Sequence, residues 1–526
     1  MAQPTIEDAQ RVLKERFGYD TFRPGQERII EAILAGKDAL AVMPTGAGKS
    51  VCYQVPAVLF NGLTIVVSPL ISLMGDQVRA LREAGIRGSY FNSTLKPRVR
   101  PEVLRRALAG WYDIMYVAPE RLCDPLFQEF ARSANVPLLA VDEAHCVSQW
   151  GQDFRPAYRQ INEFVQSLPT RPVVAGLTAT ATYRVRKDVV DYLGLTDPVV
   201  QVSGFDRENL RLATHELTPK ERKRWLVSYV RRHKDESGIV YAMTRKRVDE
   251  LAEELDREGF MVAAYHAGYE NDDRAAAQER FANDDARVMV ATNAFGMGID
   301  KSNVRYVIND GMPLSLEEYY QEAGRAGRDG EVAECHLLWS RGDIRTAHFL
   351  IENTEVPPEL TPQERDALIE SRNRLLGAMI GYAMSTSCLR RRIVRYFGQD
   401  LEGVDETCNT CSVCGWTEPR KARAIAVSRA GARDDVGARR RRASALPAYE
   451  EEPSEEDEAL FQRLRALRKQ IADEAAVPPY VVFSDKSLRE MVRNKPSTDD
   501  EFLDISGVGQ TKLERYGSVF MAELAR

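Results

Sequence analysis

A short glycine-rich segment at residues 44–50, PTGAGKS, has the residue types of a phosphate-binding loop. Glycines let backbone N–H groups turn around phosphate oxygens, and a helix N-terminus that follows them favours an anion. Lys49 would reach the β- and γ-phosphates, and the Ser50 hydroxyl would bind Mg²⁺. We therefore predict an ATP site rather than an ordinary turn, although Met43 stands where the general pattern has its first glycine. The expected nucleotide contacts of this P-loop are Thr45, Gly46, Ala47, Gly48, Lys49 and Ser50.

Two acidic residues, Asp142 and Glu143, follow an apolar run about ninety residues after the P-loop. An acid at the end of a strand can hold a metal ion, and the next acid can orient or deprotonate water. The alternative is a pair of helix N-cap acids, which the P-loop makes the weaker reading. Gln321, Arg325 and Arg328 share a later segment, QEAGRAGR, the arginine motif (321–328). Its two arginines could neutralise charge on a γ-phosphate across a domain cleft, or could simply form surface salt bridges.

Four of the eight cysteines cluster in the C-terminal half of the chain, at Cys388, Cys408, Cys411 and Cys414. Four thiolates at this spacing suit tetrahedral Zn²⁺, and four protein ligands leave no open position, so the predicted site is structural. An iron–sulfur cluster is the alternative, because thiolates ligate both metals. The other cysteines are expected to be free thiols: Cys52, Cys123, Cys146 and Cys335.

The elements that must position these residues follow from the apolar pattern. Short β-branched runs alternate with amphipathic stretches, which is typical of parallel sheets covered by helices on both faces. The pattern restarts near residue 206, so we predict two consecutive α/β domains, 1–205 and 206–345. Strands are expected at 38–43, 64–68, 114–118, 138–142 and 172–177, and then at 238–243, 261–266, 288–292, 306–310 and 335–339.

The remaining chain divides by composition into three parts. Residues 346–416 are predicted to form a helical zinc module that ends in the cysteines. Residues 417–457 join a basic part to an acidic run and are predicted to be a disordered linker, because blocks of one charge with few large apolar residues bury no core. Residues 458–526 are predicted to be a small all-α domain, with helical periodicity in Leu460, Leu464, Leu467 and Ile471.

Charge and hydropathy limit the class of protein. The net charge is −6 and the sequence pI is about 5.8, so any nucleic-acid contact must use local basic surfaces. No apolar run approaches the roughly 20 residues that span a bilayer, and the N-terminus lacks the pattern of a signal peptide. These features predict a cytoplasmic protein in a reducing compartment, with no membrane partner.

Together the motifs resemble those of superfamily 2 helicases, and finer matches resemble the RecQ family. The resemblance implies two RecA-like domains with ATP in the cleft between them. The segment FGYDTFRPGQ at 17–26 is similar to the family's adenine motif. There the resemblance implies that Tyr19 stacks on adenine while Arg23 and Gln26 bond its edge. It also implies that Thr178 and Thr180 link the state of ATP to domain closure.

A second match is SQWGQDFRP at 148–156, which resembles the family's aromatic-rich loop; we call it the aromatic loop. The resemblance implies that this loop senses single-stranded DNA and signals to the ATP site. Trp150 and Phe154 would stack on bases irrespective of sequence, and Arg155 would contact a phosphate. The chain departs from the family at Gln152, where histidine is usual, and at 309–314, NDGMPL, where a His-aromatic-Asp-x-Pro stretch is usual.

The C-terminal segments carry the resemblance further. The cysteines and the basic helix before Cys408 resemble the RecQ zinc subdomain, and the arginines at 390–392 either touch DNA or form a solvated face. Residues 458–526 resemble the HRDC domain, an auxiliary DNA-binding module. In it ISGVG at 505–509 resembles a hairpin that either offers N–H groups to a phosphate, beside Lys512 and Arg515, or serves packing alone.

Many bacterial members of the family carry a winged-helix domain between these two modules. Such a domain needs on the order of 100 residues to bury a core, whereas only about 43 residues separate Cys414 from Glu458. We therefore predict that this domain is absent and that the grip on duplex DNA is weaker. The arginines at 439–442 are either a flexible phosphate-binding arm or part of a plain tether.

The resemblance thus implies a 3′→5′ DNA helicase that couples ATP hydrolysis to movement on single-stranded DNA and to unwinding. It implies roles in recombination, repair and replication-fork maintenance, near the nucleoid. Single-stranded and forked DNA are the expected partners, with single-stranded-DNA-binding protein as a further candidate. An RNA helicase and a DNA scaffold with an inactive motor are the alternatives.

Overall fold

The structure is a computed structural model and describes residues 3–69, 71–151, 153–295, 301–354, 360–399, 407–418, 455–474, 482–483, 485–503, 505, 508 and 512–525. Compact packing divides the chain into two units. The larger comprises Met1–Ala282 and Ala286–Trp416, and the smaller contains the C-terminal part from Thr417. Most of the predicted linker at 417–457 lies outside the described residues, namely 419–454 with its arginines at 439–442, and so does Gln152. The last three residues of that prediction are helical, because α16 begins at Glu455.

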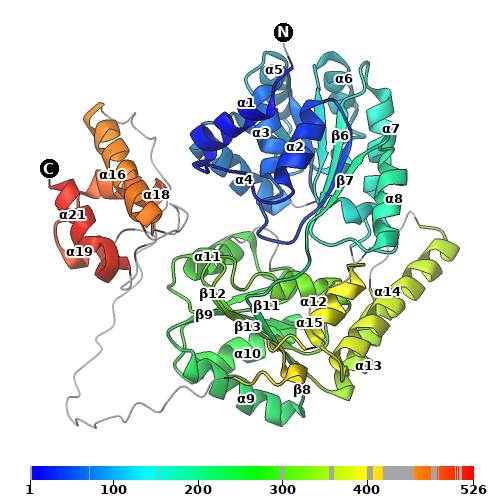
Figure 1. Cartoon of the computed structure of the whole chain (residues 1–526), viewed down its shortest axis with the longest axis vertical. Helices are drawn as coiled ribbons and strands as arrows, with labels where there is room; N and C mark the ends of the chain where they lie inside the picture. Colours follow the sequence, from blue (N-terminus) through cyan, green and yellow to red (C-terminus); the bar gives the residue numbers. More distant parts are fainter. Residues whose placement is uncertain are drawn as a thin grey trace. The chain divides into compact units, whose positions relative to one another are not determined.

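The first α/β domain is built on a parallel seven-stranded sheet of order β3-β4-β2-β5-β6-β1-β7. Figure 1 shows this sheet, where β6 and β7 are labelled, between α2 and α3 on one side and α7 and α8 on the other. Alternate residues of β1 enter different cores. Leu40 and Val42 pack in one hydrophobic cluster, and Ala39 and Ala41 pack in another. Helices therefore cover both faces, as the uninterrupted apolar runs predict. The strands are β1 (Ala39–Val42), β2 (Thr64–Val67), β3 (Gly88–Phe91), β4 (Ile114–Val117), β5 (Leu138–Val141), β6 (Val173–Thr178) and β7 (Val199–Val202).

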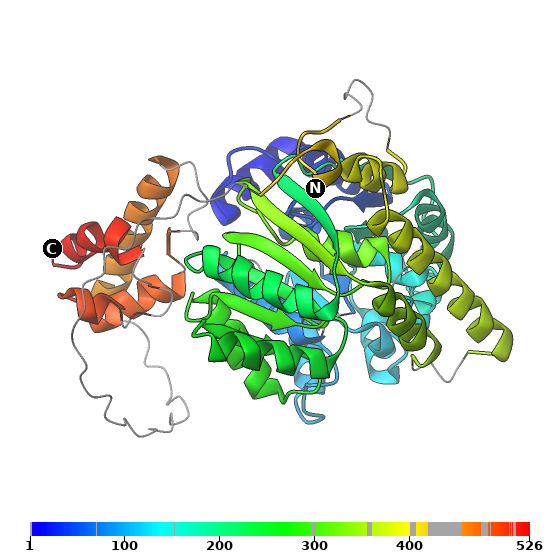
Figure 2. The ribbon, with the colours of Figure 1, turned by 90° about the horizontal axis from the view of Figure 1, so that it is seen from below.

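The second α/β domain has a parallel six-stranded sheet of order β10-β11-β9-β12-β13-β8. Ile239 and Tyr241 of β9 belong to one hydrophobic cluster, and Val240 and Ala242 belong to another, so this sheet is also covered on both faces (Figure 2). Two parallel α/β sheets in succession confirm the predicted fold class. The strands are β8 (Leu210–Glu216), β9 (Ser237–Ala242), β10 (Val262–Tyr265), β11 (Val288–Ala291), β12 (Val304–Asp310) and β13 (Ala333–Trp339).

Local sequence signals set the ends of the covering helices. Thr218 and Glu221 form a reciprocal capping box at the start of α9, and Gly194 ends α8 in the left-handed conformation, with φ 64°. The longer helices are α1 (Ile6–Val12), α2 (Gln26–Leu34), α3 (Val51–Leu59), α4 (Ile71–Glu83), α5 (Arg100–Leu108), α6 (Pro125–Ser133), α7 (Gln160–Ser167), α8 (Tyr183–Leu193), α9 (Pro219–Arg232), α10 (Arg245–Arg257), α11 (Asn271–Ala282) and α12 (Leu316–Ala323). Short helical turns are η1 (Leu13–Phe17), η2 (Pro119–Arg121), η3 (Ala144–Val147) and η4 (Pro156–Arg159).

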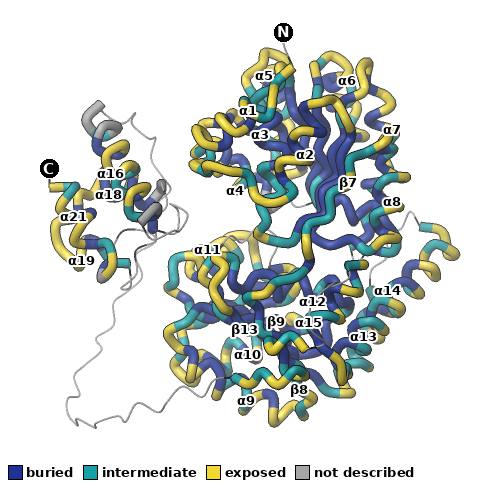
Figure 3. Tube along the Cα trace, in the orientation of Figure 1, coloured by how far each residue is buried: buried dark blue, intermediate teal, exposed yellow. Residues whose placement is uncertain are grey.

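The zinc module packs against the second α/β domain. It contains α13 (Arg341–Glu352), α14 (Pro362–Ala383), α15 (Leu389–Tyr396) and η5 (Ser412–Cys414). Cys411 forms a parallel bridge with Leu212 of β8, and the Tyr396 hydroxyl donates to Glu317 Oε1 at 2.6 Å. One hydrophobic cluster extends from the two sheets into this module, where Leu389 and Phe397 are fully buried. Figure 3 shows buried segments along the strands of both sheets.

The C-terminal unit is a small helical domain with its own core. Leu460 and Leu464 are buried and Leu467 and Ile471 are partly buried, which confirms the predicted apolar stripe. Its elements are α16 (Glu455–Glu474), α18 (Asp485–Asn494), α19 (Asp499–Leu503), η6 (Leu513–Gly517) and α21 (Ser518–Leu524). Of the predicted hairpin at 505–509, only Ile505 and Val508 lie within the described residues, and both are buried. Among the described helices of the chain, none has the length and apolarity needed to cross a membrane.

Candidate ATPase and DNA-coupling site

The P-loop joins the carboxyl end of β1 to the first turn of α3. Gly46 and Gly48 have φ values of 84° and 78°, in the left-handed region that glycine adopts without strain. Lys49 turns back over the loop, and its Nζ donates to the Met43 carbonyl at 3.4 Å. The loop therefore has the backbone form of a phosphate cradle, with its lysine at the rim.

The predicted adenine residues lie beside this loop. Gln26 Nε2 donates to two P-loop carbonyls, at 3.1 Å and 2.9 Å, and Arg23 Nη1 donates to a third. A Cβ on Gly48 would lie 2.6 Å from Gln26 Nε2, so this glycine is needed for the close approach. Tyr19 is half-buried against the N-terminal hydrophobic cluster. Contact of these residues with adenine stays a prediction.

The two acidic residues after β5 have opposite electrostatic environments. Burial raises the pKa of Asp142 to about 7, and the neighbouring charge of Glu143 adds to the shift. Burial alone would also raise the pKa of Glu143. Its hydrogen bond with His145 and the charges of His145, Lys49 and Arg325 outweigh burial and lower that pKa to about 2. Glu143 thus remains a carboxylate, which suits a group that orients water.

The residues around Asp142 can also hold a hard cation. Burial raises the pKa of Tyr53 well above its ordinary value, Asp142 adds to the shift, and a hydrogen bond with Ser50 opposes it. Ser50 and Asp142 both act on the titration of this one buried side chain. Oxygen ligands of this kind are those that Mg²⁺ prefers.

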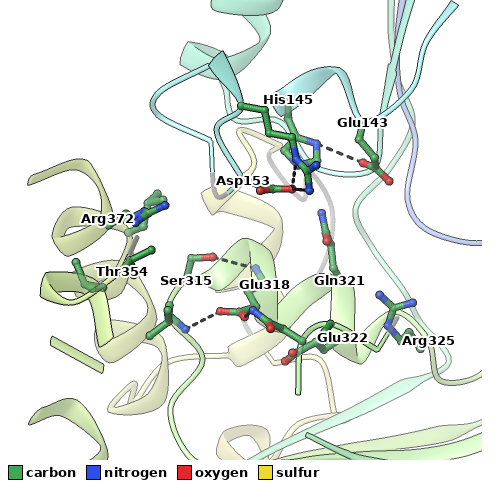
Figure 4. Close-up of a pocket in the computed structure, with 16 residues that line it drawn as sticks. Glu143, His145, Asp153, Ser315, Glu318, Gln321, Glu322, Arg325, Thr354 and Arg372 are labelled. Carbon is green, nitrogen blue, oxygen red and sulfur yellow. Dashed lines mark hydrogen bonds and ion pairs between the residues drawn. The ribbon is translucent and has the colours of Figure 1, made fainter. Parts of the chain in front are cut away.

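A series of polar contacts links Glu143 to the second domain. His145 Nδ1 lies 3.3 Å from Glu143 Oε2 and 2.8 Å from Thr178 Oγ1. Thr178 Oγ1 donates to the Thr180 carbonyl at 3.1 Å, and Thr180 Oγ1 accepts from Gln321 Nε2 at 3.0 Å. Figure 4 shows Gln321 reaching from the second domain towards His145. Glu143 of the first domain and Gln321 of the second are therefore joined by a continuous series of contacts.

The arginine motif approaches the P-loop across the same cleft. Arg325 is only 7% exposed, and its charge lowers the pKa of Glu143. Arg328 packs on the P-loop, because a Cβ on Gly46 would lie 3.5 Å from Arg328 Cγ. The structure thus brings together Lys49, Glu143, Gln321, Arg325 and Arg328, which the sequence places in two separate domains.

A cavity of about 390 Å³ adjoins this cluster (Figure 4). Glu143 and His145 line one side, Gln321 and Arg325 line another, and residues of the aromatic loop and the zinc module complete the wall. From the zinc module, Arg372 contributes a partly buried guanidinium. Burial lowers the pKa of this group, and the charge of Asp153 opposes that shift. Residues of the predicted ATP site and of the aromatic loop therefore border a common space.

The aromatic loop holds its tryptophan among cations. The guanidinium carbon of Arg184 lies 3.2 Å from the centroid of the Trp150 ring, and that of Arg374, from α14, lies 4.6 Å from it. The two distances lie within cation–π range. Phe154 is only 7% exposed and packs near Arg159, so its ring is covered in this conformation. Stacking of either ring on a base stays a prediction.

The remaining residues of the loop are fixed by polar contacts. Arg155 Nη2 pairs with Asp153 at 3.1 Å, and its Nη1 donates to the Pro69 carbonyl at 3.1 Å. A Cβ on Gly151 would lie 2.7 Å from the His145 carbonyl oxygen, so only glycine fits there. The loop is therefore folded directly onto the turn that carries Glu143 and His145.

Sequence reasoning did not single out several residues of this site. His145 ends the sequence VDEAH at 141–145, and its position two residues after Glu143 was a usable signal. Arg184 and Arg374 gave no signal, because each is an ordinary arginine in an amphipathic helix. Their proximity to Trp150 depends on how α8 and α14 pack.

The cysteines form one cluster in space. The Sγ atoms of Cys388, Cys408, Cys411 and Cys414 all lie within 4.8 Å of one another. Backbone N–H groups also point at the sulfurs, since Arg391 N donates to Cys388 and Thr410 N donates to Cys408, at 3.5 Å and 3.4 Å. Four thiolates in a closed cluster fit structural Zn²⁺, which would join α15 to the segment from 408 to 414.

Polar side chains of the unusual segment at 309–314 contact other residues of the second domain. Asn309 Nδ2 donates to Glu322 Oε2 at 2.6 Å, next to the first residue of the arginine motif. Asp310 forms a 2.7 Å ion pair with Arg247 and lies 3.7 Å from Arg222. In this sequence the segment therefore contacts the arginine motif through the hydrogen bond from Asn309 to Glu322.

Comparison with known proteins defines the class. The family model described as DEAD/DEAH box helicase matches residues 23–189, and the one described as Helicase conserved C-terminal domain matches 221–330. The models described as RecQ zinc-binding and HRDC domain match 341–415 and 457–524. The solved structure of Mycobacterium smegmatis helicase Lhr, bound to single-stranded DNA and AMP-PNP, is similar in fold, with a TM-score of 0.53 at 21% identity over 70% of this chain and 57% of that one. The chain is thus a two-domain helicase with a zinc-binding module.

Full-length relatives define the family. The ATP-dependent DNA helicase RecQ of Bacillus subtilis is 39% identical, and the alignment covers 98% of each protein. The protein of the same name from Haemophilus influenzae is 36% identical, over 98% of this chain and 95% of its own length. The chain therefore belongs to the RecQ family of ATP-dependent DNA helicases.

Proposed function

We propose that this helicase moves 3′→5′ along single-stranded DNA and separates the duplex ahead of it. The observation that carries the proposal is the contact path from Glu143 through His145, Thr178 and Thr180 to Gln321. ATP bound at the P-loop would close the cleft between the domains, and hydrolysis would open the cleft again. Because the aromatic loop is folded onto the same turn, each cycle would change the grip on DNA.

In the hydrolytic step, Lys49 binds the β- and γ-phosphates and Glu143 orients the attacking water. Arg325 and Arg328 meet the charge that develops on the γ-phosphate. Ser50 and Asp142 would hold Mg²⁺, which when bound neutralises phosphate charge. Tyr19, Arg23 and Gln26 would bind the adenine, so that the base fixes the orientation of the phosphates.

On the DNA side, Trp150 and Arg155 engage the single strand. The guanidinium groups of Arg184 and Arg374 lie over the Trp150 ring, so a base that stacks on the face next to Arg374 would displace that guanidinium. Displacement of Arg374 would release a contact between the aromatic loop and α14. DNA binding would thereby loosen the loop next to Glu143 and increase ATP turnover.

We also propose that the chain lacks a winged-helix domain. The alignment with the B. subtilis relative has 599 positions and includes 98% of this chain, which is about 515 of its 526 residues. About 84 positions of the alignment are therefore gaps in this chain. That shortage agrees with the short interval between Cys414 and Glu458. Duplex binding would then be weaker than in relatives with the longer architecture, unless the arginines at 439–442 compensate. Changing these four arginines to Ser should lower forked-duplex affinity at low salt if they form an arm, and should leave it unchanged if they form a tether.

The cellular setting is proposed from the family. The enzyme would act in the cytoplasm at the nucleoid, in recombination, repair and replication-fork maintenance, beside single-stranded-DNA-binding protein.

The direct test of the activity is ATP turnover with single-stranded DNA and with RNA of the same sequence, for the native chain and for Lys49→Ala. Strong stimulation by DNA alone, lost in the variant, supports the proposal. Equal stimulation by RNA would favour an RNA helicase, and no turnover with either would favour a scaffold.

A further inference from the structure

One arginine outside the recognised motifs spans the ATP cleft. Arg207 lies in the segment between the two sheets, after β7 and before β8. Its Nη1 donates to the carbonyl oxygen of Thr45 in the P-loop and to that of Gly324 in the arginine motif, both at 3.4 Å. Its Nη2 donates to the carbonyl oxygens of Ala326 and Gly327, at 3.0 Å and 3.1 Å. A single guanidinium thus joins the backbones of both nucleotide-facing segments.

The acceptors have a physical reason to attract a cation. Helix α12 ends at Ala323, so the Gly324 carbonyl at its C-cap lacks an intrahelical partner and lies at the negative end of the helix dipole. The Ala326 and Gly327 carbonyls follow in the next turn. The planar fork of arginine can donate to several of them at once, which an ammonium cannot match in geometry. The bonded carbonyls flank Arg325 on both sides and immediately precede Arg328. Arg207 therefore fixes the backbone from which both arginines project.

The neighbours of Arg207 hold it in place. Asp206 pairs with Arg390 of the zinc module, and the Phe205 ring stacks on Phe397 with centroids 4.4 Å apart. On the other side, Asn209 Nδ2 donates to the Gly327 carbonyl at 2.8 Å. Because the segment is anchored on both sides, the position of the Arg207 guanidinium is set by the fold rather than by a mobile loop.

We propose that Arg207 is a positioning residue for ATP hydrolysis. It holds the arginine motif at one spacing from the P-loop, so that Arg325 and Arg328 meet the γ-phosphate of an ATP bound by Lys49. Its guanidinium donates to backbone carbonyls and, through Nε, to Asn209 Oδ1 at 3.4 Å, and it acts through those two arginines. The inference rests on the roles given to them under the proposed function.

The test measures kcat and KM for ATP, with saturating single-stranded DNA, in Arg207→Ala and Arg207→Lys. A misplacement of about 1 Å in a catalytic group costs on the order of 100-fold in rate, so we expect a loss of that order in kcat for Arg207→Ala and a KM within about threefold. Arg207→Lys should recover part of the rate, because it keeps the charge but loses the fork. Arg211→Ala is the matched control, since Arg211 lies in the same region but donates to the Glu208 carbonyl. Zinc content and melting temperature report folding, and Arg207→Lys alone decides the question if Arg207→Ala is unstable.

A double-variant cycle separates this inference from the proposed function. If Arg207 acts through Arg325, adding Arg207→Ala to Arg325→Ala should cause little further loss of kcat. Multiplying losses would overturn the inference, as would a kcat within about threefold of the native value in both Arg207 variants. If Arg325→Ala itself keeps native turnover, the role of the arginine motif fails. If Arg325→Ala is impaired and the Arg207 variants are not, only the present inference fails.

Discussion

Replacing Thr180 with valine tests the contact that joins the two domains. Thr180 is 2% exposed, and its hydroxyl accepts the Gln321 amide at 3.0 Å. Valine keeps the shape of the side chain and removes only the oxygen. The carbonyl of residue 180, which accepts from Thr178, is untouched. The substitution therefore isolates one hydrogen bond across the cleft.

The size of the effect follows from the burial of the groups. Leaving a buried donor without its partner costs about 1–3 kcal/mol. Gln321 is only half-buried and can reach water when the cleft opens, so the lower end of that range applies. About 1 kcal/mol corresponds to roughly a fivefold change in the ratio of closed to open domains. We expect DNA-stimulated kcat to fall by about that factor, with basal turnover less affected.

The assay is steady-state ATP hydrolysis with and without single-stranded DNA, in Thr180→Val and in Thr180→Ser. Serine retains the hydroxyl, so it should behave like the native residue. Native values of kcat and of DNA stimulation in Thr180→Val would show that this hydrogen bond does not couple the domains. Equal losses in Thr180→Val and Thr180→Ser would point to packing and not to the bond.

Three further outcomes follow from the site. Lys49→Ala and Glu143→Gln should each abolish DNA-stimulated ATP hydrolysis. The first removes the charge that stabilises the phosphates, and the second removes the carboxylate that orients water. Near-native turnover in either variant would overturn the assignment. Trp150→Ala should reduce DNA stimulation more than basal turnover, since one base stack is worth about 1–3 kcal/mol; an unchanged ratio of the two rates would remove the aromatic loop from signalling. Metal analysis should find one zinc per chain. Cys411→Ser should give insoluble or unstable protein, because structural zinc contributes about 10–16 kcal/mol of binding energy. Iron in place of zinc, or a folded chain without metal, would contradict this.

The buried strands were predictable because each is a continuous apolar run. The ten expected runs overlap ten of the observed strands, from β1 to β13. The sequence did not predict β3, β7 or β8. Gly88 and Ser89 open β3, and β8 alternates apolar with polar residues. Each of these three strands lies at an edge of its sheet, where one side lacks a strand partner and the apolar signal is weaker.

The site was predictable where one segment carries the chemistry. The P-loop, the acids at 142–143 and the cysteines are motifs of that kind, and the structure gathers the four sulfurs into one cluster. Contacts made by packing were not predictable. The approach of Arg374 to Trp150 depends on the docking of α14, and the span of Arg207 depends on the spacing of the two domains. No periodicity or motif in the sequence encodes those distances.

Unwinding of forked duplexes with a single overhang tests the central claim most directly. Two substrates of identical sequence carry a single-stranded tail on either the 3′ or the 5′ side, and strand separation is followed with ATP, without ATP, and with Lys49→Ala. The account predicts ATP-dependent unwinding of the 3′-tailed substrate by the native chain only, and little separation of the 5′-tailed one. Preferential unwinding of the 5′-tailed substrate, or separation that does not require ATP and Lys49, would contradict it.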